Sequence, residues 1–229
     1  MIRIGLDLDG CFSDFNTRLL QELNKHTGMS KEFPLGEPSM WWYPTEELGF
    51  TQGQLDEVLD YIQANPGWWA WLPRYPFTFD VLHELATLQK NGKVEVYFIT
   101  ARPGDIEGPT TEWLRQNGFS VNTRNNTPIR IIQSDRKGLV AAGLRLMFFI
   151  EDNTDNALDI LTTTSQYADC GTIGTVGRLD KLDKHATPTM VLLIDHLYNR
   201  DARLDNHPNL ERLNNVGQAL PYILGAIYA

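Results

Sequence analysis

The chain has 229 residues, of which 42% are hydrophobic and 21% charged, and its formal net charge at pH 7 is −9. This length suits one globular domain with an inserted module and can enclose a sizeable core. The negative charge argues against a polyanion such as duplex nucleic acid as the main partner. A small phosphorylated ligand beside a local Lys or Arg and a metal remains compatible with it.

Cysteine use and the start of the chain bear on the compartment. Cys11 and Cys170 are the two cysteines and have no metal-ligand spacing, which favours a reducing compartment without disulfides. A strand pattern begins almost at the first residue, and no apolar run approaches the length of a membrane span, about 18 residues. We therefore expect a cytoplasmic protein with no signal peptide and no membrane partner.

The strongest local signal lies at the start of the chain. Apolar residues alternate with polar or small ones over residues 2–8, which is the period-2 pattern of a β-strand. Asp7 and Asp9 are two residues apart, so their side chains point to the same side at the strand's carboxyl end. Two buried carboxylates are costly unless a cation or a substrate compensates them. A lone pair would more simply begin a solvated turn, but Gly10 and Asp14 extend the pattern to Asp-x-Asp-Gly-x-x-x-Asp.

Strands and helices are expected to alternate along most of the chain. Helix patterns cover 15–28, 52–64, 78–90, 109–117, a segment after 135, a segment after 155 and the terminal segment. Strand patterns cover 2–8, 94–99, 129–132, 144–150 and 190–194. This alternation predicts an α/β fold with a parallel sheet and right-handed crossovers. Ligands of such sheets bind at the carboxyl ends of the strands, where Asp7, Asp9, Thr100 and Asp152 fall.

Several polar residues are expected at helix ends and in loops. Asp14 and Asp135 are predicted to cap the helices that follow them, and for Asp14 capping is preferred to a metal role. Asn214 and Asn215 are predicted to cap the terminal helix. Residues 162–189 lack a clear pattern and are expected to be irregular.

Residues 31–76 differ from the rest of the chain. Prolines interrupt this segment, and it holds five of the six tryptophans, Trp41, Trp42, Trp68, Trp69 and Trp71. A small module has little other core to build, so each indole is interpreted first as core. The alternative is that some of these rings line an aromatic pocket for a flat ligand.

The run that starts at Asp7 resembles motif I of the haloacid dehalogenase (HAD) superfamily, in its phosphatase branch. The other motifs of the superfamily follow in order, because Thr100 resembles motif II, Lys137 resembles motif III and Asp152 resembles motif IV. The resemblance covers residues 2–155.

This resemblance implies a fold. A Rossmann-like, three-layer core with a parallel sheet would be formed by residues 1–30 and 77–229. Residues 31–76 would form a small, mainly helical cap, inserted after the first strand and helix.

The resemblance also implies a Mg²⁺-dependent phosphomonoesterase. Asp7 is implied as the nucleophile that forms an aspartyl-phosphate, and Asp9 as the general acid and base. Asp7, the backbone carbonyl of Asp9 and Asp152 are implied as ligands of Mg²⁺. Thr100 and Lys137 are implied as donors to the phosphoryl oxygens.

Two details of the motifs stay open. Arg136 is the alternative to Lys137 for the motif III role, because the two basic residues are adjacent. Glu151 stands where the superfamily often has Asp or Gly, and either Glu151 or Asp155 could assist Asp152 at the metal.

Within the superfamily, the chain most resembles the 5'(3')-deoxyribonucleotidase group. The shared features are Asp14-Phe15, the pair Trp41-Trp42, a tryptophan-rich run before the helix at 78–90, and patterns at 191–200 and 212–216. That group encloses the nucleobase with cap aromatics, which implies Phe15, Trp41 and Trp42 as substrate-binding residues.

A small phosphate monoester, first of all a (deoxy)nucleoside monophosphate, is therefore the expected partner. Thr100, Ala101, Arg102 and Lys137 are expected to contact it, although Thr-Ala-Arg departs from the Thr-Ser-Pro that is common in the group. Rival interpretations are a phosphatase for another metabolite or a polynucleotide end, and a non-catalytic nucleotide-binding module. Asp9 argues against a dehalogenase. The base, the sugar, the position of the phosphate and a homo-oligomeric state stay open.

Overall fold

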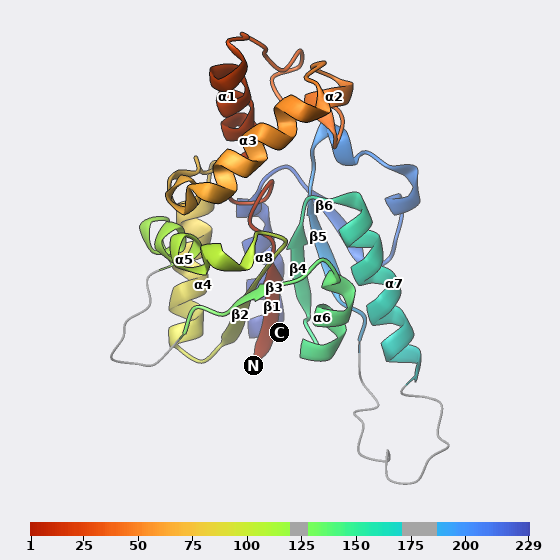
Figure 1. Ribbon diagram of the computed structural model, residues 1–229. Helices are drawn as coiled ribbons and strands as arrows, with labels where there is room; N and C mark the ends of the chain where they lie inside the picture. The colour runs from red at the N-terminus through yellow and green to blue at the C-terminus, as the bar shows by residue number, and fades with distance from the viewer. Residues whose placement is uncertain (120–127, 171–186) are drawn as a thin grey trace.

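A six-stranded sheet in the order β3-β2-β1-β4-β5-β6 forms the centre of the computed structural model (Figure 1). The structure describes residues 1–119, 128–170 and 187–229. The strands are β1 (Ile2–Leu6), β2 (Val94–Thr100), β3 (Ile131–Gln133), β4 (Phe148–Glu151), β5 (Met190–Ile194) and β6 (Leu210–Leu213). Each neighbouring pair is parallel. The predicted α/β class with a parallel sheet is confirmed.

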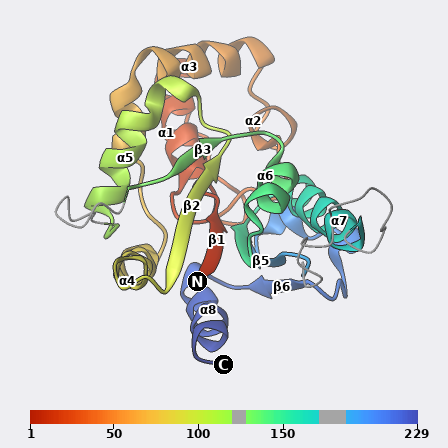
Figure 2. The same cartoon turned by 90° about the horizontal axis from the view of Figure 1, so that it is seen from below.

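Helices cover both faces of this sheet. The α-helices of the described residues are α1 (Phe15–Thr27), α2 (Tyr43–Glu46), α3 (Gln52–Ala64), α4 (Thr78–Lys90), α5 (Glu107–Gln116), α6 (Lys137–Leu144), α7 (Thr154–Cys170) and α8 (Ala219–Tyr228). Figure 2 shows α4 and α8 on one side and α6 and α7 on the other. Accordingly, Phe148 and Ile150 pack in one core cluster with α4 and α8, whereas Phe149 between them packs with α6 and α7. The core therefore has three layers, as predicted.

Helices also lie over the carboxyl edge of the sheet. Figure 1 shows α1, α2 and α3 together above this edge, and α1 packs against α3. A short 3₁₀ helix, Pro66–Trp71, follows α3. Trp68 and Trp69 of this helix are buried, whereas Trp41, Trp42 and Trp71 are exposed. Burial agrees with the core interpretation for Trp68 and Trp69 and not for the other three rings. The cap boundary at residue 31 stays a prediction.

Side-chain caps explain where two helices begin. The Asp14 carboxylate accepts a hydrogen bond from the backbone N–H of Thr17, as predicted for a cap rather than a metal ligand. Gly28 ends α1 in the left-handed conformation, with φ 69°, which glycine adopts at little cost. At the start of α3, Thr51 and Gln54 form a reciprocal capping box.

Four sequence predictions of local structure are wrong. Asp135 does not cap α6, which begins after Arg136 without a side-chain cap. The strand expected at 144–150 starts only at Phe148, because Leu144 still belongs to α6 and Arg145 has a positive φ. Residues 162–170 are helical rather than irregular, while 171–186 lie outside the described residues. Asn215 precedes a 3₁₀ turn without a side-chain cap, and β6 was not expected.

The described helices also bear on membrane insertion. None of those within 1–119, 128–170 and 187–229 combines the length and apolar character that a membrane-spanning helix requires.

Candidate active site

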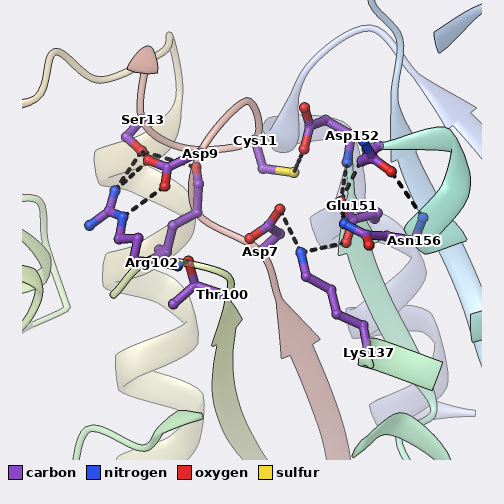
Figure 3. A network of polar contacts seen from close by, with 12 residues as sticks. Asp7, Asp9, Cys11, Ser13, Thr100, Arg102, Lys137, Glu151, Asp152 and Asn156 are labelled. Atoms are coloured by element: carbon purple, nitrogen blue, oxygen red, sulfur yellow. Dashed lines mark hydrogen bonds and ion pairs between the residues drawn. The ribbon is translucent and has the colours of Figure 1, made fainter. Parts of the chain in front are cut away.

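The predicted catalytic residues meet at the carboxyl edge of the sheet. Asp7 directly follows β1, and its backbone N–H donates to the carbonyl of Ile150 at 2.9 Å. Thr100 ends β2, and Asp152 follows β4. Lys137 is the first residue of α6. Figure 3 shows these side chains converging on one site.

Lys137 lies between two buried carboxylates. Its Nζ is 2.7 Å from Oδ2 of Asp7 and 2.8 Å from Oε2 of Glu151. Burial alone would lower the pKa of Lys137, but the two adjacent carboxylates raise it above its ordinary value. The lysine is therefore a fixed cation beside Asp7. Arg136, its alternative, is exposed to solvent.

Glu151 is fully buried and its second oxygen is also occupied. Oε1 accepts hydrogen bonds from the backbone N–H groups of Asp152 and Asn153 and from the side-chain amide of Asn156. Glu151 is thus part of a polar network around Lys137. Asp155, the other candidate for assisting the metal, is 83% exposed and pairs with Arg203.

Asp7, Cys11 and Asp152 form a buried cluster whose ligand atoms all lie within 4.8 Å of one another. Burial raises the pKa of Asp152 to about 7, and the neighbouring Asp7 adds to this effect. Burial likewise raises the pKa of Asp7 to about 7, against the opposing charge of Lys137. Such carboxylates are stabilised by a cation. Burial also raises the pKa of the Cys11 thiol, so Cys11 stays a neutral thiol rather than a hard ligand.

The surroundings of Asp152 hold its carboxylate in place. Tyr198 O–H donates to Oδ2 at 2.5 Å, and the Cys11 thiol donates to Oδ1 at 3.8 Å. Gly10 lies so close that a Cβ built on it would be 2.0 Å from Oδ2 of Asp152. The oxygen donors of Asp7 and Asp152, beside the loop that carries the Asp9 carbonyl, fit a hard cation such as Mg²⁺.

Asp9 makes a different set of contacts from Asp7. Its carboxylate accepts two hydrogen bonds from Arg102, at 2.8 and 2.6 Å, and one from the Ser13 hydroxyl at 2.8 Å. Figure 3 shows the Asp9 carboxylate turned toward Arg102 and Ser13 and away from Asp7. The sequence predicts that Arg102 contacts the substrate, which stays a prediction, and in the structure its guanidinium pairs with Asp9.

A pocket of about 320 Å³ opens above these residues. Its floor includes six of the predicted site residues, Asp7, Asp9, Thr100, Ala101, Arg102 and Lys137. Its walls are mainly apolar and come from the helices above the sheet, with Phe15, Leu19, Trp41, Trp42, Leu55, Leu59 and Trp69. The three predicted cap aromatics, Phe15, Trp41 and Trp42, therefore line the same pocket as the predicted catalytic residues.

Sequence analysis missed three residues of this region. Ser13 contacts Asp9, Trp69 stacks on Phe15 with ring centroids 5.6 Å apart, and Tyr198 contacts Asp152. Tyr198 follows β5 at the same edge of the sheet, and that position is the signal by which it could have been found. No sequence signal separates Trp69 from its buried neighbour Trp68.

Comparisons with known proteins concern the fold. The sequence matches no known protein-family profile and no curated protein at a significant level. A HAD family hydrolase from Deinococcus radiodurans R1, solved with bound phosphate and sodium, has a TM-score of 0.53 at 14% identity, covering 98% of this chain and 95% of that one. A HAD hydrolase of family IA from Entamoeba histolytica has a TM-score of 0.52 at 7% identity, covering 100% of both chains.

A third similar structure contains a phosphorylated sugar. CbbY from Rhodobacter sphaeroides, in complex with xylulose-1,5-bisphosphate, has a TM-score of 0.50 at 12% identity and covers 94% of this chain and 95% of that one. Identities this low establish the fold and not the activity. The chain has the fold of the HAD hydrolases.

Proposed function

We propose that the protein is a Mg²⁺-dependent phosphomonoesterase that acts through an aspartyl-phosphate on Asp7. One observation carries the proposal: the buried Asp7 carboxylate lies at the floor of a pocket, 2.7 Å from a lysine ammonium that a second carboxylate holds in place. A fixed cation beside a carboxylate nucleophile suits attack on an anionic phosphate, which would otherwise repel it.

The first half of the reaction transfers the phosphoryl group. An oxygen of Asp7 forms a bond to phosphorus while the bond from phosphorus to the ester oxygen breaks. Lys137 offsets the negative charge between Asp7 and the phosphoryl group. Thr100, 3% exposed at the end of β2, lines the pocket, and its hydroxyl would donate to a phosphoryl oxygen. Asp9, protonated at this stage, gives its proton to the leaving alkoxide.

The second half regenerates the enzyme. A water attacks the phosphorus of the aspartyl-phosphate and releases inorganic phosphate and the free carboxylate of Asp7. Asp9, now a carboxylate, takes a proton from this water, so that both charge and protons balance over the cycle.

A metal ion would be held by the carboxylates of Asp7 and Asp152 and by the backbone carbonyl of Asp9. When bound, Mg²⁺ reduces the repulsion between the carboxylate nucleophile and the phosphate dianion. Tyr198 and the close approach of Gly10 keep Asp152 in position for this role.

For the substrate, we propose a nucleoside monophosphate. The support is the chemistry of the walls, because Phe15, Trp41, Trp42 and Trp69 offer aromatic faces to a planar group. A sugar phosphate is the main alternative, since a neighbour of the same fold was solved with a sugar bisphosphate. The apolar walls favour the nucleobase, because a sugar presents hydroxyls that need hydrogen-bonding partners.

A phosphatase screen tests both the proposed phosphatase activity and the proposed nucleotide substrate. Purified protein is assayed with Mg²⁺ against nucleoside monophosphates, sugar phosphates and a phenyl phosphate, with Asp7→Asn and excess chelator as controls. We expect Mg²⁺-dependent release of phosphate, fastest from nucleotides and absent in Asp7→Asn. If no ester released phosphate, the proposed phosphatase activity would be contradicted. Faster hydrolysis of sugar phosphates than of nucleotides would contradict the proposed nucleotide substrate.

A further inference from the structure

Arg102 carries a buried positive charge next to the proposed acid and base. Its Nε donates to Oδ2 of Asp9 at 2.8 Å, and its Nη2 donates to Oδ1 at 2.6 Å. Nη2 also donates to the hydroxyl of Ser13 at 3.0 Å, and that hydroxyl lies 2.8 Å from Oδ1 of Asp9. A guanidinium fork bonded to both oxygens allows a carboxylate one orientation.

The rest of the guanidinium is covered by protein. Nη1 lies 3.3 Å from the hydroxyl of Thr110, and the centre of the guanidinium is 5.1 Å from the ring of Trp69 and 6.0 Å from that of Trp113. Although Arg102 borders the pocket, only 1% of its side chain is exposed. A phosphate in the pocket therefore has little access to this cation.

We propose that Arg102 is a positioning residue that acts through Asp9 and not a phosphate ligand. The proposal rests on the proposed phosphatase function. Removing the guanidinium would leave the Asp9 carboxylate with the Ser13 hydroxyl as its one remaining side-chain donor among the described residues, so that it could turn about this single bond. Proton transfer depends on a donor or acceptor held in the correct geometry.

The two oxygens of the Asp9 carboxylate differ in how many donors they contact. Oδ1 of Asp9 accepts from both Arg102 and Ser13, which occupies its two lone pairs, whereas Oδ2 accepts only from Nε of Arg102 among the described residues. Oδ2 is therefore the less occupied of the two oxygens of the Asp9 carboxylate, and Arg102 fixes its direction.

A double-mutant cycle tests whether Arg102 works through Asp9. The variants are Arg102→Met, Asp9→Asn and the two together, assayed with the best substrate of the wild-type protein. Each single variant is expected to lower kcat about 100-fold with little change in KM, because general acid and base help is typically worth about 10²–10⁴-fold. The double variant should be no slower than Asp9→Asn alone. Losses that multiply would overturn the proposal.

Inhibition by inorganic phosphate supplies a readout that a purely structural role would not give. If Arg102 does not touch phosphate, Arg102→Met keeps the inhibition constant of the wild-type protein, and a rise of tenfold or more, about 1.4 kcal/mol, would make it a phosphate ligand. Thr110→Val is the matched control. It removes the hydrogen bond of Nη1 and leaves the Asp9 pair intact, so its kcat should stay at the wild-type value.

If Arg102→Met fails to fold, Arg102→Lys takes its place in the double-mutant cycle. Lysine preserves the charge but has no planar fork, so kcat should still fall and the Arg102→Lys/Asp9→Asn double variant should equal Asp9→Asn. A kcat of Arg102→Lys equal to that of the wild type would overturn the need for the fork. Failure of the wild-type protein to hydrolyse any ester is a different result, which contradicts the proposed function itself.

Discussion

Lys137 and Glu151 form a buried ion pair, with Nζ 2.8 Å from Oε2. This contact makes Glu151 a partner of the lysine. Its other oxygen, Oε1, accepts hydrogen bonds from the backbone N–H groups of Asp152 and Asn153. Glu151 therefore fixes the cation beside Asp7, and the buried cluster of described residues that could hold a metal ion contains Asp152 instead.

Replacing Glu151 by Gln tests this assignment. The variant keeps the size of the side chain but leaves Lys137 with Asp7 as its one remaining carboxylate. Removing one partner of a buried ion pair is expected to destabilise the protein by about 3 kcal/mol and to lower kcat about tenfold through a less well-placed lysine. Chemical denaturation and initial rates measure the two effects.

Asp155→Asn is the matched control for Glu151→Gln. Asp155 is an acid of the same segment, but it is 83% exposed and pairs with Arg203 at the surface. Exposed pairs contribute little, so both stability and kcat should match the wild type. Equal effects of the two substitutions would contradict the role of Glu151.

The pKa of Asp152 predicts an unusual pH dependence of the metal-free protein. Burial raises this pKa from 3.8 to about 7. Between these values the folded protein holds a proton that the unfolded chain has lost, so the free energy of unfolding falls as pH rises. Scanning calorimetry in chelator should give a wild-type Tm whose dependence on pH between about 5 and about 7.5 changes in Asp152→Asn.

The sign of that change is fixed by the same argument. Asp152→Asn removes a contribution that declines with rising pH, so the difference in stability between variant and wild type should grow in favour of the variant from pH 5 to about 7.5. Mg²⁺ should raise the Tm of the wild type at the upper pH and have little effect on the variant. Parallel pH profiles of the two proteins would contradict a raised pKa for Asp152.

Substitution of Gly10 tests whether Asp152 belongs to the proposed Mg²⁺ site. A Cβ at this position would lie 2.0 Å from Oδ2 of Asp152, and the backbone has φ +84°. Gly10→Ala should therefore displace Asp152 and weaken Mg²⁺ binding about tenfold or more. Gly53→Ala is the control, because a Cβ on Gly53 meets no atom within 4 Å. Titration of Mg²⁺ into each variant measures the effect, and equal affinities would contradict the predicted site.

Elements with strong local signals could be predicted from the sequence, and others could not. The helix at Gln52–Ala64 has the predicted bounds because its capping box and its apolar spacing agree. Helix α7 continues through Thr163 and Thr164, which have low helix propensity, because α7 packs along α6.

The site shows the same division. The order of the motifs predicted that Asp7, Thr100, Lys137 and Asp152 meet at one edge of the sheet, because parallel strands end together there. The pairing of Arg102 with Asp9 could not be predicted, because the order of motifs places both residues at this edge but does not say which way either side chain points.

The aromatic wall gives a test of the substrate class. Trp42 lines the pocket but is 60% exposed, so Trp42→Ala should leave stability unchanged. Stacking of a base on an aromatic ring is worth about 1–3 kcal/mol, which predicts a fall in kcat/KM for a nucleotide of about tenfold to a hundredfold. Hydrolysis of a phenyl phosphate should change much less.

Trp71→Ala is the matched control for Trp42→Ala. Trp71 is 72% exposed and does not line this pocket. Its loss should therefore leave kcat/KM unchanged for both substrates. The nucleotide assignment would lose its main support if Trp42→Ala lowered kcat/KM for both substrates alike, or for neither.

Trapping of a phosphoenzyme tests the central claim most directly. Wild-type protein and Asp7→Asn are mixed with a phosphate ester labelled in its phosphoryl group, quenched in acid within the first turnover, and mapped by peptide mass spectrometry. The account predicts an acid-stable, base-labile phosphoryl group on the peptide that contains Asp7, and none in Asp7→Asn. Rapid hydrolysis with no label on that peptide, or label that persists in Asp7→Asn, would contradict it.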